Sequence, residues 1–177
     1  MKAEAIILVQ TRQIKNGLAI LQKFSIPAGK IYLSPIIDCF DGMPISWSIS
    51  TSPNAAMANA SLKDACKWLK KSDRPIIHTD RECHYRWPGW IELCNKHELV
   101  RSMSRKGCSP DNARVEGFFG RIKIEFFYGK DWKEVSIEHF IDMLDAYLWW
   151  YCEKRIKADL DYKSPMQYRR DLGLLTA

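Results

Sequence analysis

Two carboxylates, Asp80 and Glu116, stand out because basic residues surround each of them in the sequence. Asp80 closes the segment "RPIIHTD" (74–80), and Glu116 lies in "SPDNARVEGFFGRIKIEFF" (109–127). Paired carboxylates in a basic groove are hard to explain electrostatically unless a divalent cation or a phosphate ester stands between them. The residue types therefore predict metal-assisted chemistry on a phosphate ester. The basic residues in question are Arg81, Arg86, Arg105, Lys106, Arg114, Arg121 and Lys123.

Each carboxylate taken alone has a simpler explanation. A single Glu on an amphipathic helix is usually a solvated charge, and a single Asp after a strand usually supports a turn or caps a helix. The helical period, however, places Glu116 with Asn112 and Lys123 on a different side from the apolar stripe, so Glu116 can face the sheet edge at Asp80. The apolar stripe consists of Val115, Phe118, Phe119, Ile122 and Phe126.

The elements that must position these residues form one predicted α/β domain. Alternation and β-branched residues predict strands at 30–37 and 44–51, joined by the turn "DCFDGM". An antiparallel meander followed by helix-separated strands implies a mixed sheet flanked by helices, with function at the carboxyl ends of strands, where Asp80 lies. We further expect a helix at 54–71, a strand at 74–80, a short helix at 87–97, a short strand at 98–104, helices at 111–127 and 136–153, and an irregular tail at 161–174.

Composition narrows the class of protein. The chain has 177 residues, 46% of them apolar, which is enough for one domain with a core. Its formal net charge of +6 favours a polyanionic partner, although a solvated basic surface explains the same number. No apolar run approaches the roughly 18 residues of a bilayer span, and the N-terminal region lacks a signal-peptide pattern. We therefore expect a soluble cytoplasmic protein with no membrane partner.

A zinc site is the competing metal hypothesis. The six cysteines contain no Cys-x-x-Cys pair, so reduced thiols are expected. Cys83, His84, Cys94 and His97 lie within fifteen positions and supply ligands of the right kind. Cys83 and His84 are adjacent and do not easily converge on one ion, which makes zinc the weaker hypothesis.

A longer pattern of residues points to a family. Thirty-five residues separate Asp80 from Glu116, within "HTDRECHYRWPGWIELC" and "SMSRKGCSPDNARVEGFFGRIKIEFFY", and the chain closes with "YKSPMQYRR". From about Phe24 onward this pattern resembles the catalytic core of bacterial insertion-sequence transposases, in the retroviral-integrase superfamily. The resemblance is specific because it is a long match in order and spacing.

The resemblance implies a ribonuclease-H-like fold and a metal-dependent DNA strand cleavage and transfer reaction. In this family three acidic residues bind two Mg²⁺ or Mn²⁺ ions, and Asp80 and Glu116 match the second and third of them. Lys123 resembles a lysine that contacts DNA near the site. Arg81, Asn112 and Arg121 are further candidate DNA contacts. The resemblance also implies transposon-end and target DNA as partners, a homodimer or larger multimer, and a location at the bacterial nucleoid.

The first metal ligand of the family is missing. Its segment typically reads Asp-Ile-Thr-Glu-Phe, whereas this chain has "ILQKF" (20–24), which places Ile20 at the aspartate position. Reading supposed family codons one base later gives Ile-Leu-Gln-Lys, so we hypothesise that residues 6–23 are out of frame. We accordingly expect an aberrant segment at 1–23 and a catalytic core at 24–177.

Loss of that ligand predicts weakened metal binding and impaired catalysis. Asp38 and Asp41 are the nearest substitutes, but such positions usually support a turn. The strand itself should survive, with Leu18, Ile20 and Phe24 on one side and 30–37 as its partner. The alternative function is a non-catalytic remnant that binds DNA or a transposase.

The aromatic run "YLWWYCEKR" (147–155) allows two interpretations. Trp149, Trp150 and Tyr151 could stack on bases, but aromatic residues on a helix are more often part of a core or an interface. We favour the core.

Overall fold

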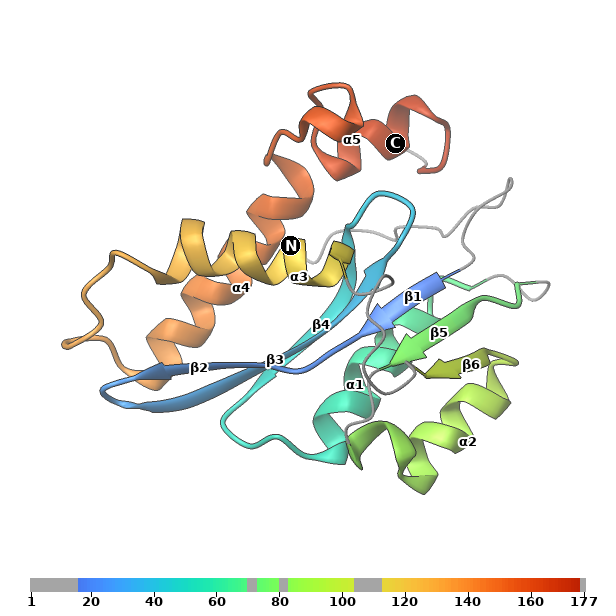
Figure 1. The fold of residues 1–177 in the computed structure, drawn as a ribbon, viewed down its shortest axis with the longest axis horizontal. Coiled ribbons are helices and arrows are strands. Elements are labelled where there is room, and N and C mark those ends of the chain that lie inside the picture. The colour runs from blue at the N-terminus through green and yellow to red at the C-terminus, as the bar shows by residue number, and fades with distance from the viewer. Residues whose placement is uncertain (1–15, 70–72, 80–82, 104–112, 176–177) are drawn as a thin grey trace.

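The computed structural model describes residues 16–69, 73–79, 83–103 and 113–175 (Figure 1). The strands are β1 (Asn16–Ala19), β2 (Gln22–Ile26), β3 (Gly29–Asp38), β4 (Pro44–Ser50), β5 (Ile76–Thr79) and β6 (Val100–Met103). The helices are α1 (Ala55–Cys66), α2 (Pro88–Lys96), α3 (Ala113–Ile122), α4 (Ile137–Glu153) and α5 (Pro165–Asp171). Short helical turns occupy Cys83–Arg86, Lys123–Phe127 and Ala158–Leu160. None of the helices in these ranges could cross a membrane, being too short or too polar.

All six of these strands belong to one mixed sheet. β3 pairs antiparallel with β1, β2 and β4, while β5 pairs parallel with both β1 and β6. The ribonuclease-H-like arrangement of an antiparallel meander followed by parallel strands is therefore confirmed. The predicted hairpin of 30–37 with 44–51 is present as β3 and β4.

β1 and β2 are two halves of one interrupted strand. Both pair with β3 in the same register, from Gly17 opposite Asp38 to Ile26 opposite Gly29. Continuing that register from Ala19 and Ile36 places Ile20 opposite Pro35, which has no backbone N–H to donate, and the ladder is broken there. The prediction that a strand here still pairs with 30–37 is confirmed.

Side chains alternate between two apolar layers, one on each face of the sheet. Leu18, Phe24 and Leu33 pack into a cluster with α3 and α4. Ala19, Ile36 and Ile77 face the opposite way and pack with α1 and α2. Figure 1 shows the two pairs of helices on opposite sides of the sheet, with α5 at one end. Packing on both faces therefore fixes which β1 side chains point toward α3 and α4 and which point toward α1 and α2.

The predicted helices begin where capping residues are available. Asn54 accepts a hydrogen bond from Met57 N at 3.0 Å, and Ser136 accepts one from His139 N at 3.1 Å. The helix predicted over 54–71 ends at Cys66. The helix predicted over 111–127 is α-helical only to Ile122 and continues as a π-helical turn over Lys123–Phe127, with Tyr128 N donating to Lys123 O at 2.6 Å.

The prediction of an irregular tail at 161–174 is wrong, because α5 occupies its centre. Ser164 caps this helix by accepting a hydrogen bond from Gln167 N at 3.2 Å, and Pro165 begins it. Met166 and Arg169 turn inward and are 4% and 2% exposed. A helix of seven residues is too short for a clear sequence period, and tertiary contacts hold it.

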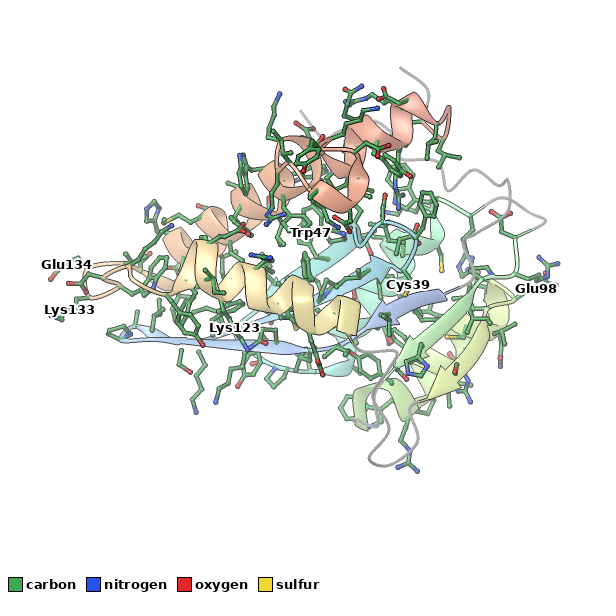
Figure 2. The ribbon with its side chains drawn as sticks, turned by 45° about the horizontal axis from the view of Figure 1, so that its top comes forward. Cys39, Trp47, Glu98, Lys123, Lys133 and Glu134 are labelled. Carbon is green, nitrogen blue, oxygen red and sulfur yellow. The ribbon has the colours of Figure 1, made fainter. Side chains whose placement is uncertain are left out.

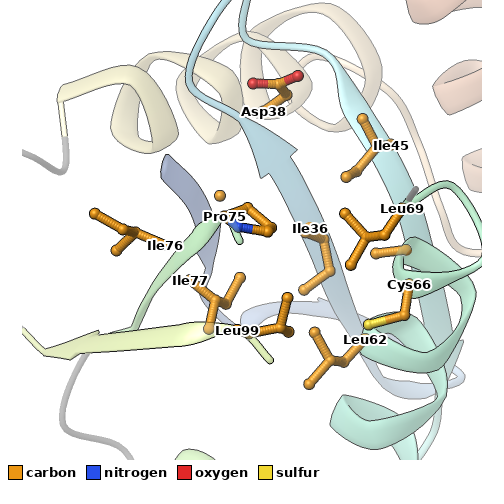
Figure 3. A pocket seen from close by; sticks show the side chains of 12 residues that line it. Ile36, Asp38, Ile45, Leu62, Cys66, Leu69, Pro75, Ile76, Ile77 and Leu99 are labelled. Carbon is orange, nitrogen blue, oxygen red and sulfur yellow. The ribbon is translucent and has the colours of Figure 1, made fainter. Parts of the chain in front are cut away.

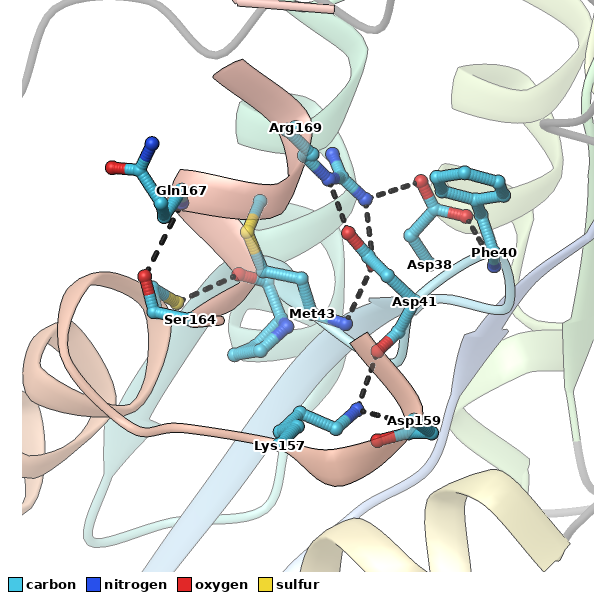
Figure 4. Close-up of polar contacts among 11 residues, drawn as sticks. Asp38, Phe40, Asp41, Met43, Lys157, Asp159, Ser164, Gln167 and Arg169 are labelled. Atoms are coloured by element: carbon cyan, nitrogen blue, oxygen red, sulfur yellow. Dashed lines mark hydrogen bonds and ion pairs between the residues drawn. The ribbon is translucent and has the colours of Figure 1, made fainter. Parts of the chain in front are cut away.

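Arg169 is the anchor of α5, and it binds the turn between β3 and β4 (Figure 4). Its Nε donates to Asp41 Oδ2 at 2.5 Å, and its Nη2 donates to Asp41 Oδ1 at 2.8 Å and Asp38 Oδ2 at 2.7 Å. All three side chains are buried, with Asp38 1% and Asp41 0% exposed. Burial raises the pKa of Asp38, and the Arg169 charge opposes that rise. The C-terminal helix thereby fixes a turn more than one hundred residues earlier.

Replacing Arg169 with alanine should destabilise the domain by about 3–5 kcal/mol, because it leaves buried carboxylates without a counter-charge. Urea unfolding followed by tryptophan fluorescence measures the change. Arg170→Ala, on the exposed side of the same helix, should shift stability by no more than about 0.5 kcal/mol. Equal effects of the two substitutions would contradict the anchoring role.

Candidate active site

The candidate site is built on three parallel strands that end side by side. Ala19 of β1 pairs with Thr79 of β5, and Thr79 pairs with Met103 of β6. The next residues in the chain after Ala19 and Thr79 are Ile20 and Asp80. Asp80 itself lies outside the described residues, as do Arg81 and Asn112. The ends of β1 and β5 nevertheless bring the chain to adjacent points just before positions 20 and 80.

Ile20 lies on the face of the sheet that α3 covers. Leu18, two residues earlier, is 1% exposed in the cluster shared with α3 and α4, and Ile20 is half-buried and packs against the same cluster. An isoleucine side chain offers no lone pair to a cation. The residue at this strand end therefore contributes apolar surface and no metal ligand.

α3 presents Glu116 next to its buried stripe. Val115, Phe118 and Ile122 are 1%, 2% and 0% exposed and hold the helix on the sheet, whereas Glu116 is exposed. Among the described residues Glu116 has no ion pair, so its carboxylate is available to a cation or to solvent. The predicted division of this helix into an apolar face and a carboxylate-bearing side is confirmed.

Lys123, the first residue of the π-helical turn after α3, continues the Glu116 side of the helix, while Arg121 does not. Lys123 follows Glu116 by seven residues, about two helical turns, and is half-buried on the helix edge that borders the sheet (Figure 2). Arg121 follows Glu116 by five residues, which places it roughly 140° around the axis. It lines a cavity with Tyr151 and Arg155. Helical geometry thus places Lys123 on the side of Glu116, two turns further along, and Arg121 on another side.

A charged cluster supports the end of this helix. Arg155 Nε donates to Glu125 Oε2 at 2.8 Å, its Nη2 donates to Oε1 at 2.6 Å, and Tyr147 Oη donates to Glu125 Oε2 at 2.9 Å. The hydrogen bond from Arg155 is the main cause that holds the pKa of Glu125 below its usual value. The guanidinium also stacks on Tyr151, 5.2 Å from the ring centre. Sequence reasoning missed this cluster because its partners lie 22 and 30 residues apart.

Asp38 and Asp41 are not substitutes for the missing ligand. Asp38 pairs with Gly17, at the opposite end of β1 from Ile20, and both carboxylates are bound by Arg169. A metal ion would have to displace a buried guanidinium to reach them. The expectation that these positions support a turn is confirmed, since Asp38 and Asp41 accept hydrogen bonds from Phe40 N at 2.9 Å and Met43 N at 3.0 Å.

Of the two cysteines that prompted the zinc hypothesis, the structure describes the side chain of Cys94 alone, and it is a buried thiol. Cys94 is fully buried beside Cys66, and burial raises the pKa of the two thiols to about 11 and about 12. The described residues contain no group of three or more His, Cys, Asp or Glu side chains arranged to hold a metal ion. The side chains of Cys83 and His84 lie outside the described part.

Two of the three aromatic residues of α4 pack internally. The rings of Trp149 and Trp47 pack edge-on with their centres 5.0 Å apart. Tyr151 is 3% exposed, and its ring centre lies 5.2 Å from that of Phe118. Trp150 is 45% exposed. The core interpretation is confirmed for Trp149 and Tyr151.

A small apolar cavity lies between α1 and the sheet (Figure 3). Its volume is about 40 Å³, and Ile36, Leu62 and Ile77 are among its lining residues. Asp38 is the one charged residue among the described residues that line it, and the Asp38 carboxylate is already bound by Arg169, so a water there would lack the several polar partners that it requires. We regard it as a packing defect rather than a binding site.

Family models match most of the chain. A model described as "Integrase core domain" matches residues 19–109, and a second one with the same description matches residues 116–172. The first match includes Ile20 and Asp80, and the second begins at Glu116.

Curated relatives are transposases. The chain is 49% identical over 156 residues to a probable transposase for insertion sequence element IS1353 of Shigella flexneri, covering 88% of this chain and 30% of that protein. It is 35% identical over 159 residues to the putative transposase InsK for IS150 of Escherichia coli K12, covering 90% and 56%. The chain thus spans 30% to 56% of the length of these proteins.

Solved structures share the fold. The catalytic core domain of HTLV-2 integrase in complex with magnesium aligns with a TM-score of 0.59 at 13% identity, covering 88% of this chain and 95% of that one. A chain of the simian T-cell lymphotropic virus intasome in complex with PP2A regulatory subunit B56 gamma aligns with a TM-score of 0.71 at 17% identity, covering 94% and 58%.

The Glu125–Arg155 pair should make stability depend on pH. Because the folded pKa of Glu125 is depressed, its contribution is complete above its usual value of 4.5 and is lost as the pH falls below that value. Glu125→Gln should cost about 1–2 kcal/mol at pH 7 and progressively less below pH 4.5. Urea unfolding across this pH range tests it, with the exposed Glu134→Gln as control. A constant difference from pH 7 to pH 3 would be incompatible with the pair.

Proposed function

Because the chain belongs to the integrase core domain family of insertion-sequence transposases, we propose that it is a transposase catalytic core whose DNA cleavage and strand-transfer chemistry is impaired at Ile20. The transposases that match this chain are longer than it, so the activity of a complete transposase is part of this proposal. The observation that carries it is the pairing of Ala19 with Thr79. That pairing sets position 20, which bears no carboxylate, beside the strand end that leads to Asp80.

Asp80 and Glu116 are the proposed metal ligands. Their oxygen atoms suit Mg²⁺ or Mn²⁺, and the magnesium complex of the HTLV-2 integrase core supports this choice of ion. Such ions, when bound, activate a water or a DNA 3′-hydroxyl and stabilise the leaving oxygen. Two carboxylates hold a cation more weakly than three, and Ile20 removes the oxygen donor that would complete the set. The resulting site should bind metal weakly and react slowly.

DNA is the proposed partner. The net charge of +6 suits a phosphate backbone, and Lys123 extends from the same side of α3 as Glu116. Arg81, Asn112 and Arg121 remain candidate contacts, although Arg121 would meet DNA on another side of α3. A dimer or larger multimer is proposed as the working assembly, supported by the trimeric and dimeric forms of the HTLV-2 core.

We propose that the substitution at position 20 arose by a change of reading frame upstream of Phe24. The fold is compatible with this proposal, because β1 and β2 pair with β3 and Leu18 is buried. Sequencing the gene tests the proposal, since one alternative frame of residues 6–23 should encode the missing acidic motif. The division into segments 1–23 and 24–177 stands or falls with that sequence.

A non-catalytic remnant that binds DNA or an intact transposase is the second candidate. The observation that favours it is a complete sheet and core combined with an apolar residue at the first ligand position. Such a chain would compete for DNA or partners without cutting. Adding the chain to an active related transposase in a strand-transfer assay tests this candidate. A loss of strand-transfer activity would support it, and unchanged activity would contradict it.

Restoring the acid should restore activity. Ile20→Asp should increase Mg²⁺- or Mn²⁺-dependent nicking of a supercoiled plasmid by about 100-fold or more, because it completes the metal-binding set. Ile20→Asn is the matched control, with similar shape and no charge. Adding Glu116→Gln to Ile20→Asp should abolish the gain. Rapid nicking by the unaltered chain, sensitive to Glu116→Gln, would show that another residue supplies the first ligand.

A further inference from the structure

A cavity lined by cationic side chains lies on the side of α3 away from Glu116. It has a volume of about 480 Å³ and lies among α3, the connection from α4 to α5, and the β3–β4 turn. Gly117 and Arg121 of α3 line it, together with Arg155, Ile156 and Lys157 of the connection. Neither Glu116 nor Lys123 lines this cavity, so it is separate from the proposed metal site.

The lining carries more positive than negative charge. Arg121, Arg155 and Lys157 contribute three cations, and Asp159 contributes one carboxylate, which is 63% exposed and lies 3.5 Å from Lys157 Nζ. Glu125 lies behind Arg155 and is bound to it. Within the described part of the chain, Arg121 has no hydrogen bond or ion pair. Arg121 acts on Glu125 through its charge alone, so an anionic ligand would meet a net positive surface with one guanidinium whose N–H donors are not used by the described residues.

Two of the three cations are held in place before any ligand arrives. The side chain of Arg155, 15% exposed, is fixed by Glu125 and by stacking on Tyr151. Lys157, 13% exposed at its side chain, donates from Nζ to Asp41 O at 2.5 Å (Figure 4). Preorganised donors bind an anion with little loss of side-chain entropy. Because Arg155 and Lys157 are fixed by these contacts, the cavity differs from a group of mobile lysines on the surface.

The shape of the cavity suits a phosphate that carries an organic group. A Cβ added at Gly117 would meet nothing within 4 Å, so the helix leaves open space there. Ile156, 64% exposed, adds an apolar surface beside the cations. A phosphodiester combines an anionic oxygen pair with an apolar sugar edge, and arginine forks match phosphate oxygens.

We infer that this cavity binds a backbone phosphate of duplex DNA that passes α3 on the side away from Glu116. The inference rests on the proposed function, because it takes DNA as the partner. It adds a sequence-independent contact that positions the duplex relative to the helix carrying Glu116. Arg121 is thereby assigned to this second contact and not to the metal site.

Equilibrium binding without metal tests the inference apart from catalysis. The probe is a fluorescein-labelled random-sequence 30-base-pair duplex, measured by anisotropy in EDTA over a series of salt concentrations. Arg121→Ala should weaken binding about five- to tenfold at low salt and reduce the slope of log K against log salt by about 0.9, the value for one lost phosphate contact. Arg121→Lys should retain part of the affinity, because it keeps the charge but loses the fork.

A steric variant separates the cavity from general charge effects. Gly117→Leu fills the open space without changing charge and favours the helix, so it should weaken binding and lower the salt slope as Arg121→Ala does. Lys63→Ala, an exposed lysine on α1 across the sheet, is the charge control and should leave both quantities near those of the unaltered chain. Circular dichroism confirms that each variant is folded.

The outcomes distinguish this inference from the proposed function. If the chain binds the duplex but Arg121→Ala and Gly117→Leu keep its affinity and slope, the cavity assignment is overturned while the transposase proposal stands. If the unaltered chain binds no duplex, the cavity assignment is overturned as well. The nicking assay with Ile20→Asp then decides the proposed function separately.

Discussion

The structure depends on the backbone pairing of one short strand, β1, with two neighbours of opposite direction. Its residues Gly17 to Ala19 pair antiparallel with β3 and parallel with β5, so β1 joins the meander to the parallel half of the sheet. Ladder hydrogen bonds come from main-chain groups and do not require particular side chains. A segment with altered residues can therefore occupy this place if it alternates suitably. The same pairing delivers position 20 to the candidate site whatever residue stands there.

Packing on both faces makes the fold depend little on the exact residues of β1. The cluster under α3 and α4 contains Leu18, Phe24 and Ile26 from β1 and β2, but most of its members come from β3, α3, α4 and the residues between those helices. Apolar cores accept substitution when volume and patterning are kept. A metal site has no comparable tolerance, because each ligand is an individual oxygen atom at a fixed place. Fold and chemistry can thus separate at a single residue such as Ile20.

Local and periodic features were readable from the sequence, and long-range ones were not. The hairpin of 30–37 with 44–51, the strand that includes Ile77 and the apolar stripe of α3 followed from alternation and helical spacing. α5 did not, because its anchor, Arg169, finds its partners 131 and 128 residues away. Helical geometry predicts which side of α3 Arg121 occupies. The cavity beside Arg121 could not be predicted, because residues of the distant α4–α5 connection form its other wall. Asp80 as a metal ligand remains a prediction of the family resemblance.

The Arg169 anchor also bears on the order in which the protein folds during its synthesis. Asp38 and Asp41 leave the ribosome before Arg169, which follows them by 131 and 128 residues. At about 5–20 residues per second, the two acids wait roughly 6–26 seconds for that guanidinium. Burying them sooner would leave charge uncompensated, so the β3–β4 turn should stay hydrated while α4 is being made. A chain released before α5 is made would lack Arg169, so its β3–β4 turn would stay unfolded. We expect quality-control proteases to cleave such a chain more readily than the complete one.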